Sequence, residues 1–143
     1  MSETTVLLVD DEEDFVAVLS ERLAHRGLAV DAATSGEEAL ERARAKGYDA
    51  VLLDMAMPGL DGVETLKRLR SINADLQVVI LTGQATLAQG VEAMKAGALD
   101  LVEKPVDLDD LVGLIDDAAR RRTTLDDERV KRRIEEVTRK RGW

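Results

Sequence analysis

The chain of 143 residues contains no cysteine and a single histidine, His25. These absences exclude a disulfide scaffold, a thiol nucleophile, a Cys-ligated zinc or iron-sulfur site and a cluster of histidine metal ligands. With one Phe, one Tyr and one Trp, the chain also lacks the aromatic side chains of a surface that stacks bases or sugars. The longest apolar runs, such as 78–81, have the length of a strand, and residues 1–5 carry no basic and apolar leader. We therefore expect neither export nor a membrane span.

The charge is acidic and unevenly distributed. There are 29 acidic and 20 basic side chains, a net charge of -9, which disfavours a nucleic-acid-binding surface over the whole chain. Residues 1–117 hold 24 acidic and 10 basic side chains, whereas residues 118–143 hold 5 and 10. The exclusion of nucleic acid is therefore weaker for this basic tail, which has the charge to contact an acidic partner or the rest of its own chain.

Short apolar runs alternate with amphipathic stretches along one domain-sized chain. The continuous runs are apolar on both faces, as in parallel strands covered by helices on both sides. Right-handed crossovers between five such units predict an α/β fold with a doubly wound, five-stranded parallel sheet. The expected strands are 6–9, 28–32, 50–53, 78–81 and 99–102, with 28–32 as a weaker edge strand.

Helical spacing of apolar residues predicts a helix after each strand. The first ends near Gly27, the second opens with a capping box at Ser35, and the third begins near Asp61. The inward residues are expected to be Phe15, Val16, Leu19 and Leu23 in the first helix, Val63, Leu66 and Leu69 in the third, Leu87, Val91 and Met94 in the fourth, and Leu108, Leu111, Leu114, Ile115 and Ala118 in the fifth. In the fourth helix, Gly90 costs about 1 kcal/mol relative to Ala.

After about Arg121 the sequence becomes dense in charge and poor in core residues. The stretch Thr124-Leu125-Asp126-Asp127 resembles the start of a further helix, with Leu125, Val130, Ile134 and Val137 as a thin apolar stripe. This segment is either a solvated, charged helix or a continuation of the preceding helix into a dimer contact.

Polar residues stand where the predicted strands end. Asp10-Asp11-Glu12 follows the first strand, Asp54 the third, Thr82-Gly83 the fourth and Glu103-Lys104-Pro105 the fifth. Because ligands of open α/β sheets bind beyond the carboxyl ends of the strands, these side chains are expected to converge. Taken singly, each has a plainer interpretation as a helix cap, a turn, a strand-end hydroxyl or a solvated ammonium.

Several carboxylates beside one ammonium require a further positive charge. Oxygen ligands without His or Cys favour a hard cation, and Mg²⁺ typically takes one or two carboxylates, waters and a phosphate oxygen. Lys104 would then oppose the phosphate charge, Thr82 would donate its hydroxyl to the phosphate, and Gly83 would let the backbone N–H approach closely. A carboxylate facing such a phosphoryl group is a competent nucleophile, so these residues predict phosphoryl transfer onto an aspartate.

At these residues the sequence resembles the receiver domain of bacterial two-component response regulators. The resemblance covers residues 4 to about 121 and rests on Val-Asp-Asp-Glu at 9–12, Leu-Leu-Asp-Met-Ala-Met-Pro-Gly-Leu-Asp-Gly at 52–62, Leu-Thr-Gly at 81–83, Ala-Gly-Ala at 96–98 and Glu-Lys-Pro at 103–105. It implies a flavodoxin-like strand order 2-1-3-4-5, a cytoplasmic location, and a sensor histidine kinase or phosphotransfer protein as partner. The last 22 residues, 122–143, would be a charged helical tail or the start of a linker.

The resemblance also assigns roles. It implies Asp54 as phosphoacceptor and Asp10 and Asp11 as Mg²⁺ carboxylates, with Asp54 and the backbone carbonyl of Ala56 as further metal ligands. It implies Thr82 as the switch hydroxyl and Lys104 as the phosphate partner, in a Lys104-Pro105 bond that is commonly cis.

The sequence departs from the family pattern in two respects. Many receivers carry Tyr or Phe three positions before the lysine, where this chain has Leu101. We therefore expect the signal to be expressed mainly by the 82–98 loop and helix, which Gly90 would make easier to shift. Ala56 and Gln84 occupy the positions that face the attacking water, and since only Gln84 can orient water, we expect a phosphoryl group of moderate to long life.

Other functions fit the sequence less well. A Mg²⁺-dependent phosphatase of the aspartyl-phosphate type would usually have a second Asp where Ala56 stands, and a nucleotide-binding module would need a glycine pattern that Gly59 and Gly62 do not make. The sequence is consistent with a single-domain regulator or with the receiver of a longer one, and a homodimer is open in either case.

Overall fold

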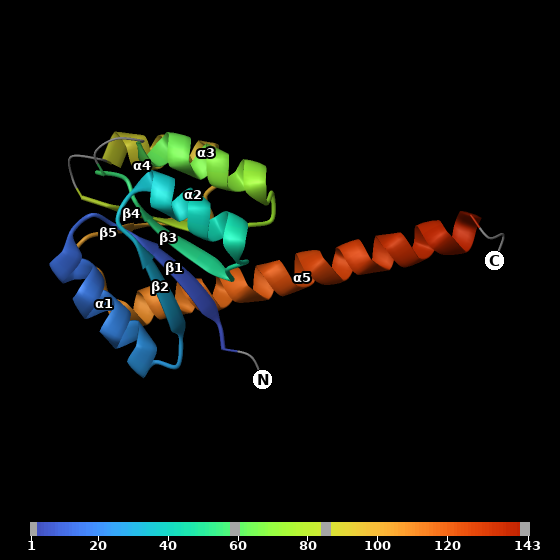
Figure 1. The fold of residues 1–143 in the computed structure, drawn as a ribbon, viewed down its shortest axis with the longest axis horizontal. Coiled ribbons are helices and arrows are strands. Elements are labelled where there is room, and N and C mark those ends of the chain that lie inside the picture. Colours follow the sequence, from blue (N-terminus) through green and yellow to red (C-terminus); the bar gives the residue numbers. More distant parts are fainter. Residues whose placement is uncertain (1–2, 58–60, 84–86, 141–143) are drawn as a thin grey trace.

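The computed structural model describes residues 3–57, 61–83 and 87–140. Five parallel strands form one sheet in the order β2-β1-β3-β4-β5, drawn as arrows in Figure 1. The expected fold class and strand order are therefore confirmed. The strands are β1 Thr5–Val9, β2 Ala29–Ala33, β3 Ala50–Asp54, β4 Val78–Thr82 and β5 Asp100–Glu103.

Helices cover both faces of the sheet (Figure 1). Helices α1 (Glu13–His25) and α5 (Leu108–Lys140) lie on one face, and α2 (Gly36–Ala45), α3 (Gly62–Ile72) and α4 (Leu87–Lys95) on the other. Successive strand residues alternate between the two cores, so Val6 and Leu8 pack toward α1 and α5 while Leu7 and Val9 pack toward α2 and α3. This burial on both faces explains why the strands read as unbroken apolar runs.

Local signals set the helix ends as expected. The Ser35 hydroxyl accepts from the Glu38 N–H at 3.1 Å, and the Asp61 carboxylate accepts from the Glu64 N–H at 2.8 Å. The Glu38 carboxylate in turn accepts from the N–H of Thr34 at 3.3 Å. Gly27 follows α1 with a φ of 86°, which an L side chain adopts only with strain.

The inward face of α4 differs from the expected one. Val91 and Met94 are 49% and 38% exposed, and the buried residues are Gly90 and Ala93; the side chain of Leu87 lies outside the described part. The reason is close packing, because a Cβ at Gly90 would collide with Cδ1 of Leu101. Small residues therefore face the sheet, and Gly90 has a packing role that helical periodicity could not reveal.

The second helix start expected at Thr124 is wrong, because α5 is one continuous helix of 33 residues. Residues 108–140 contain no proline, and the Thr123 hydroxyl donates to the Ala119 carbonyl within the helix at 3.1 Å, so this stretch does not interrupt it. Figure 1 shows α5 continuing well beyond the sheet as a straight rod. Although α5 is long, no described helix is apolar enough to cross a membrane.

Two ion pairs fix the direction of this rod at the amino edge of the sheet. The Arg122 guanidinium lies 3.0 Å from the carboxylate of Asp49, which also accepts from the N–H of Thr5 at 2.8 Å. About two turns further on, Arg129 pairs with Asp75, just before β4. The extension is therefore attached where strands β3 and β4 begin.

Candidate functional site

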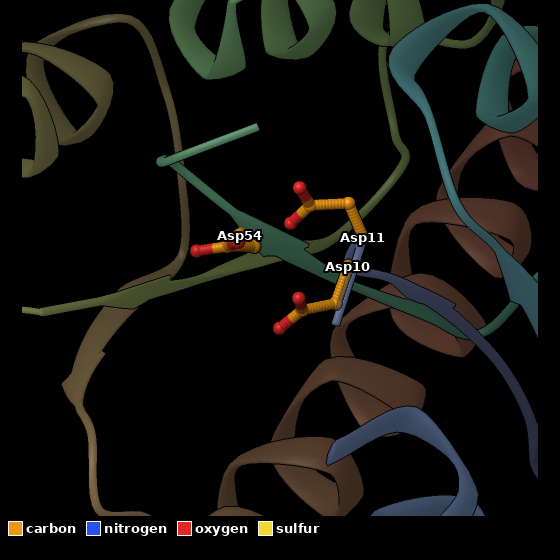
Figure 2. Close-up of side chains that lie close together, drawn as sticks. All are labelled: Asp10, Asp11 and Asp54. Carbon is orange, nitrogen blue, oxygen red and sulfur yellow. The ribbon is translucent and has the colours of Figure 1, made fainter. Parts of the chain in front are cut away.

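Three carboxylates meet at the opposite, carboxyl edge of the sheet (Figure 2). Asp10 and Asp11 follow β1, and Asp54 is the last residue of β3, which pairs with β1 in parallel. One oxygen of each lies within 4.8 Å of one oxygen of the others. Asp10 and Asp54 are 0% and 2% exposed, whereas Asp11 is exposed. The parallel register thus brings together side chains 43 and 44 positions apart in the sequence, as predicted.

Lys104, after β5, is the ammonium of this site. Its Nζ lies 2.8 Å from Asp10 Oδ2, 3.8 Å from Asp54 Oδ1 and 3.5 Å from Glu12 Oε1. The same Nζ lies 4.3 Å from the centre of the Phe15 ring, a cation–π distance that restricts where the ammonium can lie. Sequence reasoning missed this role of Phe15, because the contact depends on how α1 follows β1 in the folded chain.

The charges of the site do not balance. Among the described residues, four carboxylates (Asp10, Asp11, Glu12 and Asp54) surround one ammonium. Burial and the negative charge of Asp10 raise the pKa of Asp54 to about 6. Burial alone would lower the pKa of Lys104, but its hydrogen bond to Asp10 and the charge of Asp54 raise it above its usual value. The pocket therefore has an excess of negative charge and oxygen donors that could hold a metal cation.

The remaining predicted residues surround this pocket. Thr82 is buried at the end of β4 and donates its hydroxyl to the Gly83 carbonyl at 2.9 Å, while the Thr82 carbonyl accepts from the Lys104 N–H at 2.8 Å. A Cβ at Gly83 would meet open space, so the backbone there is accessible. The Ala56 N–H donates to Asp54 Oδ1 at 3.3 Å.

Two further expectations concern the rim of the site. The Lys104-Pro105 bond is cis, as the resemblance implied. Gln84 lies outside the described residues, so its predicted role stays a prediction.

With this geometry established, comparison with known proteins gives the family. The family model described as "Response regulator receiver domain" matches residues 6–116. The chain belongs to the response regulator receiver domain family. This family consists of signalling phosphoacceptors rather than enzymes with a separate substrate, and membership implies a histidine kinase as partner.

Individual relatives agree with this assignment. The receiver is 37% identical over 123 residues to the transcriptional regulatory protein ZraR of Escherichia coli strain K12, covering 86% of this chain and 28% of that protein. It is 38% identical over 122 residues to the response regulator MprA of Mycolicibacterium vanbaalenii, covering 85% of this chain and 52% of that protein. The chain thus spans about a quarter to about a half of the length of these two relatives.

Solved structures agree as well. A response regulator receiver domain protein from Clostridium thermocellum superposes with a TM-score of 0.81 at 33% identity, covering 85% of this chain and 98% of that one. The fold and the family of the receiver therefore rest on both sequence and structure.

Proposed function

We propose that this receiver accepts a phosphoryl group on Asp54 from a histidine kinase, a phosphotransfer protein or a small acyl phosphate. The observation that carries the proposal is the buried carboxylate of Asp54 beside Asp10, with Lys104 as the one ammonium that balances it among the described residues. Such a carboxylate has no structural need for its position, because it is neither a helix cap nor fully paired. A nucleophile that must face a phosphoryl group and a cation requires this arrangement.

The chemistry follows from the positions of the side chains. A carboxylate oxygen of Asp54 attacks the phosphorus atom, a new O–P bond forms, and the bond from phosphorus to the donor nitrogen or oxygen breaks with its electron pair leaving on the donor. Lys104 lies 3.8 Å from Asp54 and opposes the charge of the phosphoryl oxygens. The hydroxyl of Thr82 and the backbone N–H of Gly83 are the proposed donors to the same oxygens.

The metal belongs to the same proposal. Asp10, Asp11, Asp54 and the backbone carbonyl of Ala56 would hold Mg²⁺, a hard cation that suits an all-oxygen donor set. When bound, Mg²⁺ would neutralise negative charge on the carboxylates and on the phosphoryl group. Burial and the negative charge of Asp10 raise the pKa of Asp54 to about 6, which supports this reading because a cation beside the two carboxylates would offset that charge.

The surface next to Lys104 is suited to a donor protein. A groove of about 440 Å³ lies between α1 and the segment after β5, lined among others by Phe15, Val18 and Pro105. Val18 is 50% exposed at this groove. A phosphohistidine must come close to Asp54, so the protein that carries it has to cover surface beside the pocket, and we place its contact on this apolar groove.

The division of the chain is also part of the proposal. Residues 4–121 would form the receiver and residues 122–143 a charged helical tail or the start of a linker, in a protein that we place in the cytoplasm. Phosphorylation is proposed to alter the 82–105 region and thereby partner binding or self-association. We do not favour a phosphatase that turns over free phosphoesters, because Ala56 supplies no acidic side chain to the leaving group.

Incubation with acetyl phosphate and Mg²⁺, followed by intact mass measurement, tests the proposal. The parent should gain the mass of one phosphoryl group, and Asp54→Asn should not. Asp61→Asn is the matched control, because Asn also caps a helix well and the α3 start should persist. Equal phosphorylation of Asp54→Asn and the parent would refute Asp54 as the acceptor.

A further inference from the structure

Lys104 is held both at its backbone and at the end of its side chain. Its backbone N–H donates to the Thr82 carbonyl at 2.8 Å, and its ammonium lies 4.3 Å from the centre of the Phe15 ring. Phe15 stands in the first turn of α1. The Glu12 N–H just before this helix donates to Asp10 Oδ1 at 2.9 Å. The turn between β1 and α1 therefore sets the ring beside the ammonium.

The carboxylate partners of this ammonium are groups that the proposed reaction also uses, or are exposed to water. Asp10 Oδ2, at 2.8 Å, belongs to a proposed cation ligand, and an ammonium is held less firmly beside a carboxylate that a divalent cation shares, because the two positive charges repel. Asp54 Oδ1, at 3.8 Å, belongs to the proposed nucleophile. The Glu12 side chain, at 3.5 Å, is 67% exposed, and water weakens an ion pair there.

The Phe15 ring is a partner of a different kind. It is neutral and offers no metal ligand, so its face attracts the ammonium without competing for a cation. The ring is half-buried and packs against the core between the sheet, α1 and α5, which restricts its movement. A lysine ammonium sits on a flexible four-carbon stem and is strongly hydrated. It therefore keeps one position only where a neighbouring group restricts it.

We propose that Phe15 is the positioning residue that keeps the Lys104 ammonium facing the phosphoryl group when the carboxylates of the site are occupied. The inference rests on the proposed function, because it concerns the phosphate partner of that same site. Phe15 supplies no polar group to the reaction and acts only through Lys104.

The magnetic resonance spectrum of the lysine side chains tests this hold without any phosphoryl transfer. Protons over the face of an aromatic ring resonate upfield, so the ε-methylene signal of Lys104 should lie upfield in the parent and move downfield in Phe15→Leu. Lys104→Arg identifies the signal by its loss. The upfield position should persist in the parent at saturating Mg²⁺, alone and with beryllofluoride. A return to the ordinary lysine position on addition of Mg²⁺ would overturn the proposal.

This readout separates the inference from the function on which it rests. A parent that neither gains mass from acetyl phosphate nor binds beryllofluoride would refute the role of Asp54. The lysine signal of the same chain, with and without Mg²⁺, would still show whether the ring holds the ammonium.

Binding of beryllofluoride, a mimic of the phosphoryl group, measures the consequence by calorimetric titration. At saturating Mg²⁺, Phe15→Leu should weaken this binding about tenfold, because Leu is apolar but has no aromatic face. Phe15→Tyr keeps the face and should bind nearly as well as the parent. The affinity for Mg²⁺ itself should stay near that of the parent in both variants. Equal losses in Phe15→Leu and Phe15→Tyr, or equal losses of Mg²⁺ and beryllofluoride affinity, would overturn the proposal.

Docking of a donor protein is kept out of this comparison. Phe15 also borders the groove where we place the donor, but Leu keeps the groove apolar and beryllofluoride needs no docking surface. Leu40→Val is the matched control for lost apolar volume, because Leu40 is buried in α2 on the other face of the sheet. It should leave beryllofluoride binding unchanged, and a loss as large as that in Phe15→Leu would overturn the proposal.

A double-mutant cycle shows whether Phe15 acts through Lys104. Lys104→Met keeps an apolar stem and removes the ammonium, so in this background Phe15→Leu should cause almost no further loss of beryllofluoride binding. A further loss of about tenfold, as large as in the parent, would mean that Phe15 acts independently of the ammonium and would overturn the assignment.

Discussion

The carboxylates at the two edges of the sheet differ in how their negative charge is balanced. At the amino edge two carboxylates are each paired with an arginine of α5, Asp49 with Arg122 and Asp75 with Arg129. At the carboxyl edge, among the described residues, Asp10, Glu12 and Asp54 share Lys104, and the carboxylate of Asp11 lies beside those of Asp10 and Asp54. Balanced charge serves the attachment of a helix, whereas unbalanced charge at the carboxyl edge leaves a place for a cation and a phosphoryl group.

The largest expected effect is on metal affinity at the unbalanced edge. Asp11→Asn should weaken Mg²⁺ binding about a hundredfold, since it removes a charged ligand that is proposed to face the metal. Without Mg²⁺ the free energy of unfolding should stay the same or rise slightly, because a like charge is removed from the cluster. Calorimetric titration and denaturation without metal measure both.

The control for this variant is Asp14→Asn, an exposed acid in the first turn of α1. It should leave Mg²⁺ affinity near that of the parent. Equal losses in the two variants would mean that general charge, rather than the three-carboxylate site, sets the affinity.

At the balanced edge the same kind of change should cost stability instead. Asp49→Ala leaves Arg122 and the N–H of Thr5 without their acceptor and should lower the free energy of unfolding by about 2 kcal/mol. Urea denaturation measures this loss, and amide exchange should show faster opening near residue 122. Phosphorylation by acetyl phosphate should be unaffected, so a variant that loses it would break the separation between the edges.

The carboxyl edge should also be the side that senses the donor. The experiment needs a histidine kinase that phosphorylates the parent. Val18→Asp should slow phosphotransfer from this kinase about tenfold, because the substitution places a charge in the apolar groove. Its phosphorylation by acetyl phosphate should match the parent, since the small donor needs no docking surface. Equal slowing with both donors would mean that the substitution disturbs phosphoryl transfer in the pocket and not the docking of the kinase.

The smallest effect is expected from a change in the packing of α4 against the side chains next to Thr82. Gly90→Ala gains up to about 1 kcal/mol of helix propensity, but its methyl group would collide with Leu101. We expect a net loss of about 1 kcal/mol in the parent and a gain of similar size in a Leu101→Ala background. Denaturation of the parent, the two single variants and the double variant gives the sign of the change in the free energy of unfolding. Stabilisation by Gly90→Ala in the parent would show that Leu101 simply rotates away.

The site was more predictable than the packing around it. Asp10, Asp54, Thr82 and Lys104 stand at strand ends, and parallel pairing necessarily collects strand ends at one edge. The cation–π contact of Phe15 with Lys104 was not foreseen. It depends on how α1 leaves β1, which no short sequence pattern records.

The helices show the same limit. Apolar periodicity placed Leu66 and Leu69 correctly in the core. It wrongly assigned Val91 and Met94 to the core, because periodicity records which residues are apolar and not how much space the fold leaves for them. Around Gly90 the available space decided which side of α4 faces the sheet.

The sequence alone determined the alternating strands and helices, the strand ends that carry the acidic pocket, and the basic character of the last residues. These features are local, because periodicity, caps and charge depend on residues that are close together in the sequence. Only the tertiary structure decided that α5 runs unbroken past the sheet, that Arg122 and Arg129 attach it to the amino edge, and which surfaces remain uncovered. These features join residues such as Asp49 and Arg122, 73 positions apart, and such contacts arise only when the folded chain brings the two residues together.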